Sequence, residues 1–186
     1  MSAILHSADV VRRLLLSTRA SVAVEFAIIV PVMLVMYFGT FEASRLVRAY
    51  MTANRAAQII ANLVAAEGAD GVSPSDSTDF CAAGKLAMSP FPGSSLKATI
   101  ASITKNLSSG AIAFDWQDTT CGGGAGTLSN ATTSSNGLLV TNGDTMIIVQ
   151  TKYSYTGTIQ FVLPGTYSIT QAAYQRPRSG GTIPHS

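Results

Sequence analysis

Residues 22–41 read VAVEFAIIVPVMLVMYFGTF, and Glu25 is the only charged residue among them. A helix of about 20 apolar residues crosses a hydrocarbon core of roughly 30 Å. Pro31 and Gly39 destabilise helices in water but are tolerated in membrane helices. Hydrophobic residues make up 47% of the 186-residue chain and charged residues only 12%, which also favours a membrane segment. We therefore expect one membrane span; the alternatives are a buried core helix and a cleaved secretory signal.

The flanking residues predict the orientation of the span. Arg12, Arg13 and Arg19 precede it, and three more arginines follow within residues 45–55, so the positive-inside rule modestly favours a cytoplasmic N-terminus. The segment after Gly68 is rich in Gly, Ser and Thr and holds both cysteines, which is typical of an exported domain. We predict a single-pass protein with its C-terminal domain outside the cytoplasm.

Glu25 is unusual, because a carboxylate at the centre of a span costs roughly 2.5–3.5 kcal/mol and less near its edge. The simple interpretation is an acid that reaches back to the interface. A functional interpretation needs a positive partner at the same depth. If the chain were cut before Ser21, the new α-amino group would lie one helical turn (i, i+4) from Glu25 and could pair with it.

This arrangement resembles a known family. A basic leader, a small residue, four further residues and then Glu25-Phe26 form the pattern of class III prepilin-peptidase substrates. AVEFAIIVPVML looks like the TadE-like proteins, pseudopilins of the tight-adherence (Flp pilus) system. The resemblance covers residues 17–66, and the later YSITQAAYQRPRSG is similar to the endings of such proteins. The family usually has Gly before the cut, and this chain has Ala20, the next smallest residue.

The resemblance implies cleavage between Ala20 and Ser21 by a TadV-like prepilin peptidase, with Glu25 and Phe26 as the assembly motif. It also implies a minor pilin or pseudopilin of the bacterial inner membrane. Its expected partners are that membrane, other pilin or TadE/TadF-like subunits and the pilus assembly platform. Two final locations stay open, the membrane base and the pilus itself. The alternative function is an uncleaved, signal-anchored periplasmic binding domain with no role in a pilus.

The helix is expected to continue beyond the membrane, because residues 42–66 contain no Gly or Pro and Gly68 supplies a stop signal. At 1.5 Å per residue, the helix over residues 22–66 would be about 67 Å long. An apolar stripe could pack on this protein's own C-terminal domain or in a pilus-like bundle. We predict a leader at 1–20, a helix at 21–66 and an exported domain at 67–186. The stripe consists of Leu46, Tyr50, Ala53, Ala57, Ile60 and Val64.

The C-terminal domain has the pattern of an antiparallel sheet. Residues 67–95 predict a loop with a short helix near 82–88. Asn142-Gly143 lies between two apolar runs and predicts a hairpin with a type I′ turn. In the second run, residues 147, 149, 151, 153 and 155 share one face. The prediction is an α+β, pilin-like fold with four or five strands, drawn from KATIASI, AIAFDWQ, the two runs of the hairpin, TIQFVL and TYSITQAAY.

Cys81 and Cys121 lie too far apart in the sequence for a CxxC redox or zinc motif, and two sulfurs alone cannot make a structural zinc site. A reduced pair is expected in the cytosol and a disulfide in an exported domain. A bridge between them would stabilise the domain by roughly 3–4 kcal/mol in the chain-entropy model.

The sequence offers little catalytic chemistry. His6 and His185 lie near the termini without an evident triad partner or metal-ligand spacing. Asp115 and Asp118 flank Trp116, and the alternation of a strand makes a solvated face more plausible than a carboxylate pair. The glycine-rich CGGGAG matches no phosphate-binding motif. Because the sequence shows no nucleophile-base pair, we expect neither an enzyme nor a cofactor. The net charge of +2 and the lack of a basic patch interleaved with aromatics also argue against a nucleic-acid partner.

Overall fold

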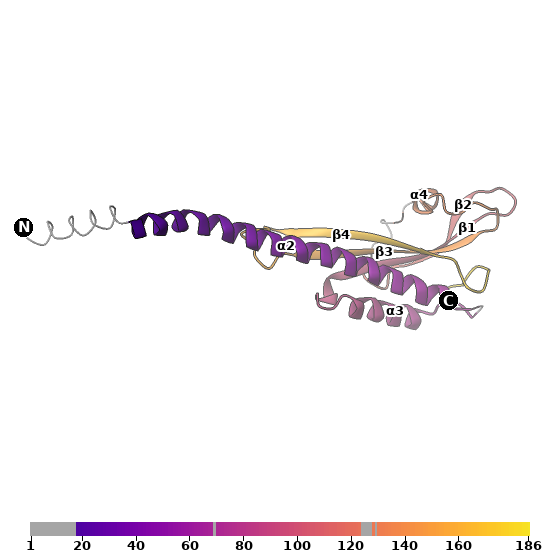
Figure 1. Cartoon of the computed structure of the whole chain (residues 1–186). Coiled ribbons are helices and arrows are strands. Elements are labelled where there is room, and N and C mark those ends of the chain that lie inside the picture. The colour runs from indigo at the N-terminus through magenta and orange to yellow at the C-terminus, as the bar shows by residue number, and fades with distance from the viewer. Residues whose placement is uncertain (1–17, 69, 124–127, 129) are drawn as a thin grey trace, which may run out of the picture. The chain divides into compact units, whose positions relative to one another are not determined.

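The computed structural model describes residues 18–68, 70–123, 128 and 130–186, so most of the predicted leader lies outside the described residues. The architecture is α+β, as predicted: a long apolar N-terminal helix is followed by a four-stranded antiparallel sheet (Figure 1). The elements are α2 (Thr18–Ala66), α3 (Pro74–Ala87), the 3₁₀ turn η1 (Gly93–Ser95), β1 (Leu96–Lys105), β2 (Ile112–Asp118), α4 (Ala131–Ser134), β3 (Thr145–Thr156) and β4 (Thr166–Gln175).

The chain forms two compact units. The first contains the described residues up to Ser44 together with the loop Thr158–Pro164 between β3 and β4. The second contains Arg45–Gly157 and Gly165–Ser186, and therefore the remainder of α2, the sheet and the smaller helices.

The sheet has the strand order β2-β1-β3-β4, and every neighbouring pair is antiparallel. The central strand β3 pairs with both β1 and β4, so that Val149 lies opposite Ile100 on one side and Ala173 on the other. The predicted face of β3 is confirmed, because its alternate residues are all buried. They are Ile147, Val149, Thr151, Tyr153 and Tyr155.

The second half of α2 packs on this face of the sheet together with α3, which confirms that the apolar stripe is covered by the protein's own domain. Small side chains allow close approach, since Gly84 on α3 leaves room for Ile60 and a Cβ there would come within 2.5 Å of it. Tyr50 is 54% exposed, so its assignment to the stripe is wrong. Four members of the predicted stripe are fully buried, namely Ala53, Ala57, Ile60 and Val64. Four alanines outside the stripe are buried as well: Ala49, Ala56, Ala61 and Ala65.

The opposite face of the sheet has its own, smaller core. Ile103, Met146 and Ile148 meet Leu128 and Leu139 from the segment that contains α4. Among the described residues of this segment, the Asn130 side chain caps α4 by accepting the backbone N–H of Thr133.

The predicted hairpin at Asn142-Gly143 is wrong. The run before it, residues 138–141, forms no strand, because β1 takes the position beside β3 that this run would have filled. Gly143 has a positive φ of 88°, but Asn142 does not, so the type I′ requirement is not met. Gly143 instead donates its backbone N–H to the carbonyl of Lys105 and anchors the turn to the end of β1.

Two other local predictions need correction. The helix after α2 is longer than expected and includes Cys81, because Ser73 and Asp76 form a capping box directly before and within its first turn. TIQFVL forms no strand; it is the turn between β3 and β4, in which the carbonyl of Ile159 accepts the N–H groups of Val162 and Leu163. TYSITQAAY, in contrast, is strand β4 as predicted.

Candidate functional site

The first half of α2 is an apolar helix whose large side chains are mostly exposed. Its large side chains are exposed along the whole of residues 22–41, from Val22 at 65% to Phe41 at 44%. The Thr40 hydroxyl donates to the carbonyl of Met36 at 2.8 Å, so this polar group is satisfied inside the helix. The segment is long and apolar enough to cross a membrane, which makes it a candidate single span.

The predicted processing and assembly residues all lie on this helix. Ala20 and Ser21 belong to the helical backbone, and Glu25 follows Ser21 by one turn. Glu25 is exposed and Phe26 is 65% exposed, so neither is buried within the protein. The cut after Ala20 and the pairing of Glu25 with a new amine stay predictions.

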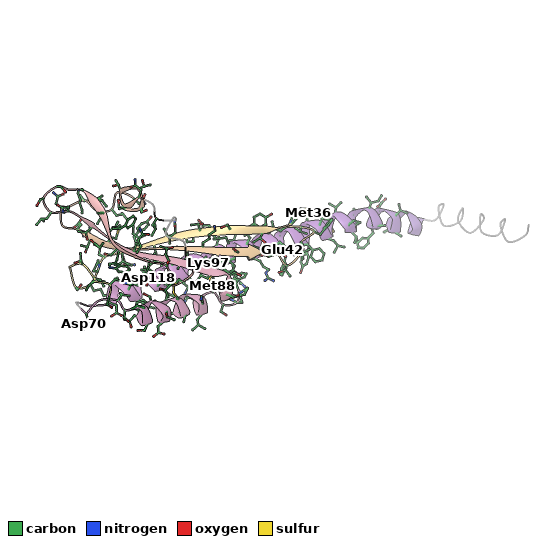
Figure 2. All side chains as sticks on the ribbon, turned by 180° about the vertical axis from the view of Figure 1, so that it is seen from behind. Met36, Glu42, Asp70, Met88, Lys97 and Asp118 are labelled. Carbon is green, nitrogen blue, oxygen red and sulfur yellow. A yellow bond between two sulfur atoms is a disulfide. The ribbon has the colours of Figure 1, made fainter. Side chains whose placement is uncertain are left out.

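Glu42 is a residue that sequence reasoning missed. It follows the apolar run directly, yet it is only 1% exposed. Figure 2 labels Glu42 on α2. Its Oε1 accepts the backbone N–H of Ile159 at 2.6 Å, so this carboxylate binds the loop Thr158–Pro164 within the first compact unit. A charge-assisted bond of this length is stronger than a neutral one.

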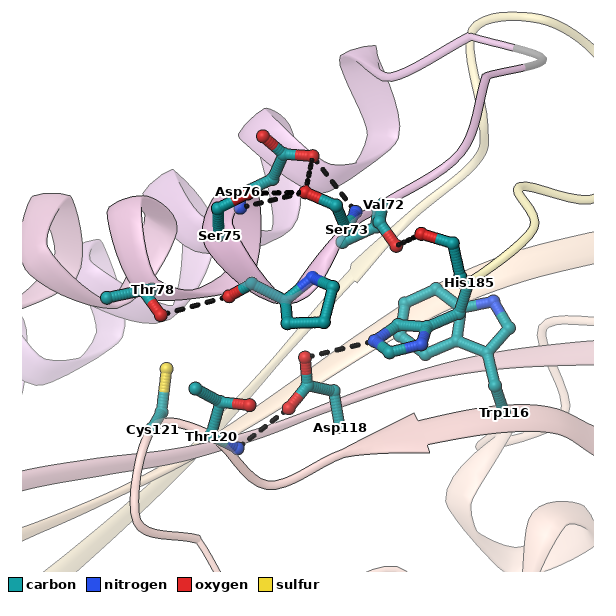
Figure 3. A network of polar contacts seen from close by, with 12 residues as sticks. Val72, Ser73, Ser75, Asp76, Thr78, Trp116, Asp118, Thr120, Cys121 and His185 are labelled. Carbon is teal, nitrogen blue, oxygen red and sulfur yellow. Dashed lines mark hydrogen bonds and ion pairs between the residues drawn. The ribbon is translucent and has the colours of Figure 1, made fainter.

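A second missed group joins the C-terminal residues to the sheet (Figure 3). His185 Nε2 lies 3.1 Å from Asp118 Oδ2, and the Thr120 backbone N–H donates to Asp118 Oδ1 at 2.7 Å. The Trp116 ring lies 4.9 Å from the His185 ring and donates its Nε1–H to the carbonyl of Ile183 at 2.7 Å. The sequence analysis did not identify Asp118 as a hydrogen-bond partner of His185.

Asp115 and Asp118, the two carboxylates that flank Trp116, differ in their surroundings. Asp115 is exposed, as alternation predicts, and accepts hydrogen bonds from the Ser102 and Thr104 hydroxyls. Asp118 lies on the Trp116 face and is buried, with 6% exposure. The period-2 pattern could have identified Asp118 as inward-facing, but nothing local in the sequence indicates His185 as its partner.

Asp118 is held ionised by its neighbours. Burial alone would raise its pKa, but Ser77, Thr120 and His185 outweigh burial and lower the pKa to about 2. The buried Ser77 hydroxyl makes no hydrogen bond of ordinary geometry, so its effect on the pKa comes from its proximity to the carboxylate. His185 binds Asp118 and Trp116 binds the carbonyl of Ile183, so the group fastens the C-terminal residues to β2.

The disulfide is present. Cys81 on α3 and Cys121 just after β2 are bonded across 40 positions, with their Cα atoms 5.5 Å apart. Both cysteines belong to the core beneath α2. Among the described side chains, no group of three His, Cys, Asp or Glu could hold a metal ion.

The comparison with known protein families gives a match on the long helix α2. Residues 20–62 match the TadE-like protein family. No curated protein and no solved structure matches the chain. The matched residues lie wholly within α2 and include Ala20, Ser21, Glu25 and Phe26. The predicted resemblance is thus confirmed, and residues 20–62 form a TadE-like segment.

Proposed function

We propose that this protein is a minor pilin or pseudopilin that takes part in assembly of a Flp-type, tight-adherence pilus after cleavage between Ala20 and Ser21. One observation carries the proposal: the TadE-like match coincides with an apolar helix whose large side chains the rest of the chain leaves uncovered. Such a surface is stable only in lipid or against other apolar helices, and a pilin helix meets both in turn.

Glu25 has a physical role in this scheme. In the membrane, its charge has to be compensated, and the α-amino group of Ser21 in a cleaved protein would lie one helical turn away. Because Glu25 is exposed, its carboxylate could also pair with the α-amino group of a processed neighbouring subunit. Glu25 then favours insertion next to a processed subunit and disfavours passive diffusion in lipid.

The proposed location is the bacterial inner membrane, with the N-terminus in the cytoplasm. The Cys81–Cys121 bridge supports export of the second unit, because disulfides persist in oxidising compartments. The proposed partners are a TadV-like prepilin peptidase, TadE/TadF-like or other pilin subunits and the pilus assembly platform.

The cut is tested by the intact mass of the protein extracted from membranes of cells that contain an active prepilin peptidase. We expect loss of residues 1–20 and Ser21 as the first residue. Ala20→Gly should be cleaved at least as completely, and Ala20→Leu should block the cut by its size. An intact leader in the wild-type protein would refute processing and favour the uncleaved binding domain.

The role of Glu25 is tested by Glu25→Gln, which keeps the size of the side chain and removes its charge. Piliation should fail while the protein still reaches the membrane, as shown by electron microscopy and membrane fractionation. Glu67→Gln, at the end of α2, is the matched control and should leave piliation intact. Normal pili in the Glu25 variant would reduce Glu25 to an interfacial acid.

A further inference from the structure

The loop Thr158–Pro164 exposes an apolar tip. Its sequence, TIQFVLP, contains four large apolar residues and no charge. Phe161 is 87% exposed, more than any other large apolar residue whose side chain is described. We propose that this loop is a membrane anchor, which inserts Phe161 into the interface of the bilayer that α2 crosses.

The loop is held on the helix by a specific contact. Glu42 Oε1 accepts the Ile159 N–H at 2.6 Å, and Glu42 is almost completely buried. Within the loop, the carbonyl of Ile159 accepts the N–H groups of Val162 and Leu163 at 2.9 and 3.1 Å. The turn thus satisfies part of its own backbone and leaves the Phe161 side chain at its tip, free of the rest of the protein.

The position of this contact sets the depth of the loop. Glu42 follows Phe41, where the apolar run of about 20 residues needed to cross the hydrocarbon ends. A group bound to Glu42 therefore lies at the level where hydrocarbon gives way to headgroups. Apolar side chains of interfacial elements enter this boundary to a depth of about 5–10 Å, which is within reach of a phenylalanine from the turn.

Lipid is the occupant that these observations favour. The loop belongs to the same compact unit as the span, and both expose large apolar side chains. The loop carries no charged side chain that would specify a protein partner by an ion pair, and its exposed Gln160, beside Phe161, is uncharged and can hydrogen-bond with headgroups or water. Aromatic side chains are enriched at this level of membrane proteins. The inference rests on the proposed function only in that α2 must be the membrane span.

The test uses the full chain in vesicles of phosphatidylethanolamine and phosphatidylglycerol that contain lipids brominated at a shallow or a deep chain position. Phe161→Trp supplies the loop probe and Leu34→Trp, at the centre of the apolar run, the span probe. Leu107→Trp, an exposed leucine of the second unit, supplies a baseline, and the native Trp116 is a constant background in all three. We expect the loop probe to lose most of its emission to shallow bromines, and the span probe to deep ones.

The outcomes separate the two claims. If the span probe is quenched and the loop probe equals the baseline, the anchor is refuted while the span stands. If neither probe is quenched, α2 does not insert and the proposed function fails with it. A blue-shifted loop probe that bromines do not quench would assign Phe161 to a protein contact and overturn the proposal. Adding Glu42→Gln should weaken quenching of the loop probe and leave the span probe unchanged.

Discussion

The two halves of α2 are one continuous helix in secondary structure, but they differ in what covers them. Residues 22–41 carry large apolar side chains that are exposed, whereas the later half buries alanines, Ile60 and Val64 against the sheet and α3. Large side chains on all faces suit a fluid or exchangeable environment, and small ones suit one fixed neighbour. The second half is therefore packed within the chain, whereas most large side chains of the first half are left exposed by the described residues.

The largest expected effect is on the stability of the second unit and comes from the disulfide. This bond joins α3 to the end of β2, next to the second half of α2. Replacing both cysteines by serine should destabilise the second unit by about 3–4 kcal/mol, because the unfolded chain regains the freedom of a loop of 40 positions. Denaturant unfolding in detergent, followed by circular dichroism, measures the loss. A reductant should lower the stability of the wild type and leave the double variant unchanged; two labelled thiols in exported wild-type protein would contradict the bridge.

Two isoleucines on α2 compare its halves directly. Ile60→Ala removes a fully buried side chain and should cost about 3 kcal/mol through lost burial and the cavity that remains. Ile28→Ala, at a position that is 68% exposed, should change the unfolding free energy of the second unit by no more than about 0.5 kcal/mol. The same unfolding experiment measures both. Equal effects would mean that the first half is also packed within the protein.

The smallest expected effect is the loss of stability at low pH through protonation of Asp118. The folded-state pKa of Asp118 is about 2, below the ordinary value of about 4 in an unfolded chain, so its stabilisation is full above about pH 4. It is lost as the pH falls from about 4 through 2. Asp118→Asn should therefore cost on the order of 1 kcal/mol at pH 7, after allowance for solvent screening, and progressively less below pH 4.

Unfolding midpoints at pH 7, 4 and 2.5 measure this change, and Asp79→Asn, at an exposed position on α3, is the control. A difference between wild type and Asp118→Asn that does not vary with pH would contradict the role of the ionised carboxylate.

The parts of the fold that the sequence could predict are those with local signals. The apolar run, the spacing of Glu25 from Ser21 and the alternation in β3 each depend on neighbouring residues, and they predicted the span, the family and the buried face. The disulfide followed from composition and an expected compartment. The hairpin failed because Asn142-Gly143 favours a turn locally but cannot determine which strand pairs with β3.

The functional contacts that were missed are all distant in the sequence. Glu42 and Ile159 are 117 positions apart, and Asp118 and His185 are 67 apart. Glu42 resembled an ordinary polar residue at the end of a span, and TIQFVL had the composition of a strand. Only the tertiary structure shows that Glu42 binds the loop that contains TIQFVL.

The bridge between Cys81 and Cys121 also determines how the chain would respond to tension. If α2 and the C-terminal residues were pulled apart, force would pass through the bridge and bypass the 40 positions that it closes. These positions hold about 130 Å of extended chain, at roughly 3.3 Å per residue. A subunit under load would therefore keep that length in reserve, and only reduction of the bond would release it.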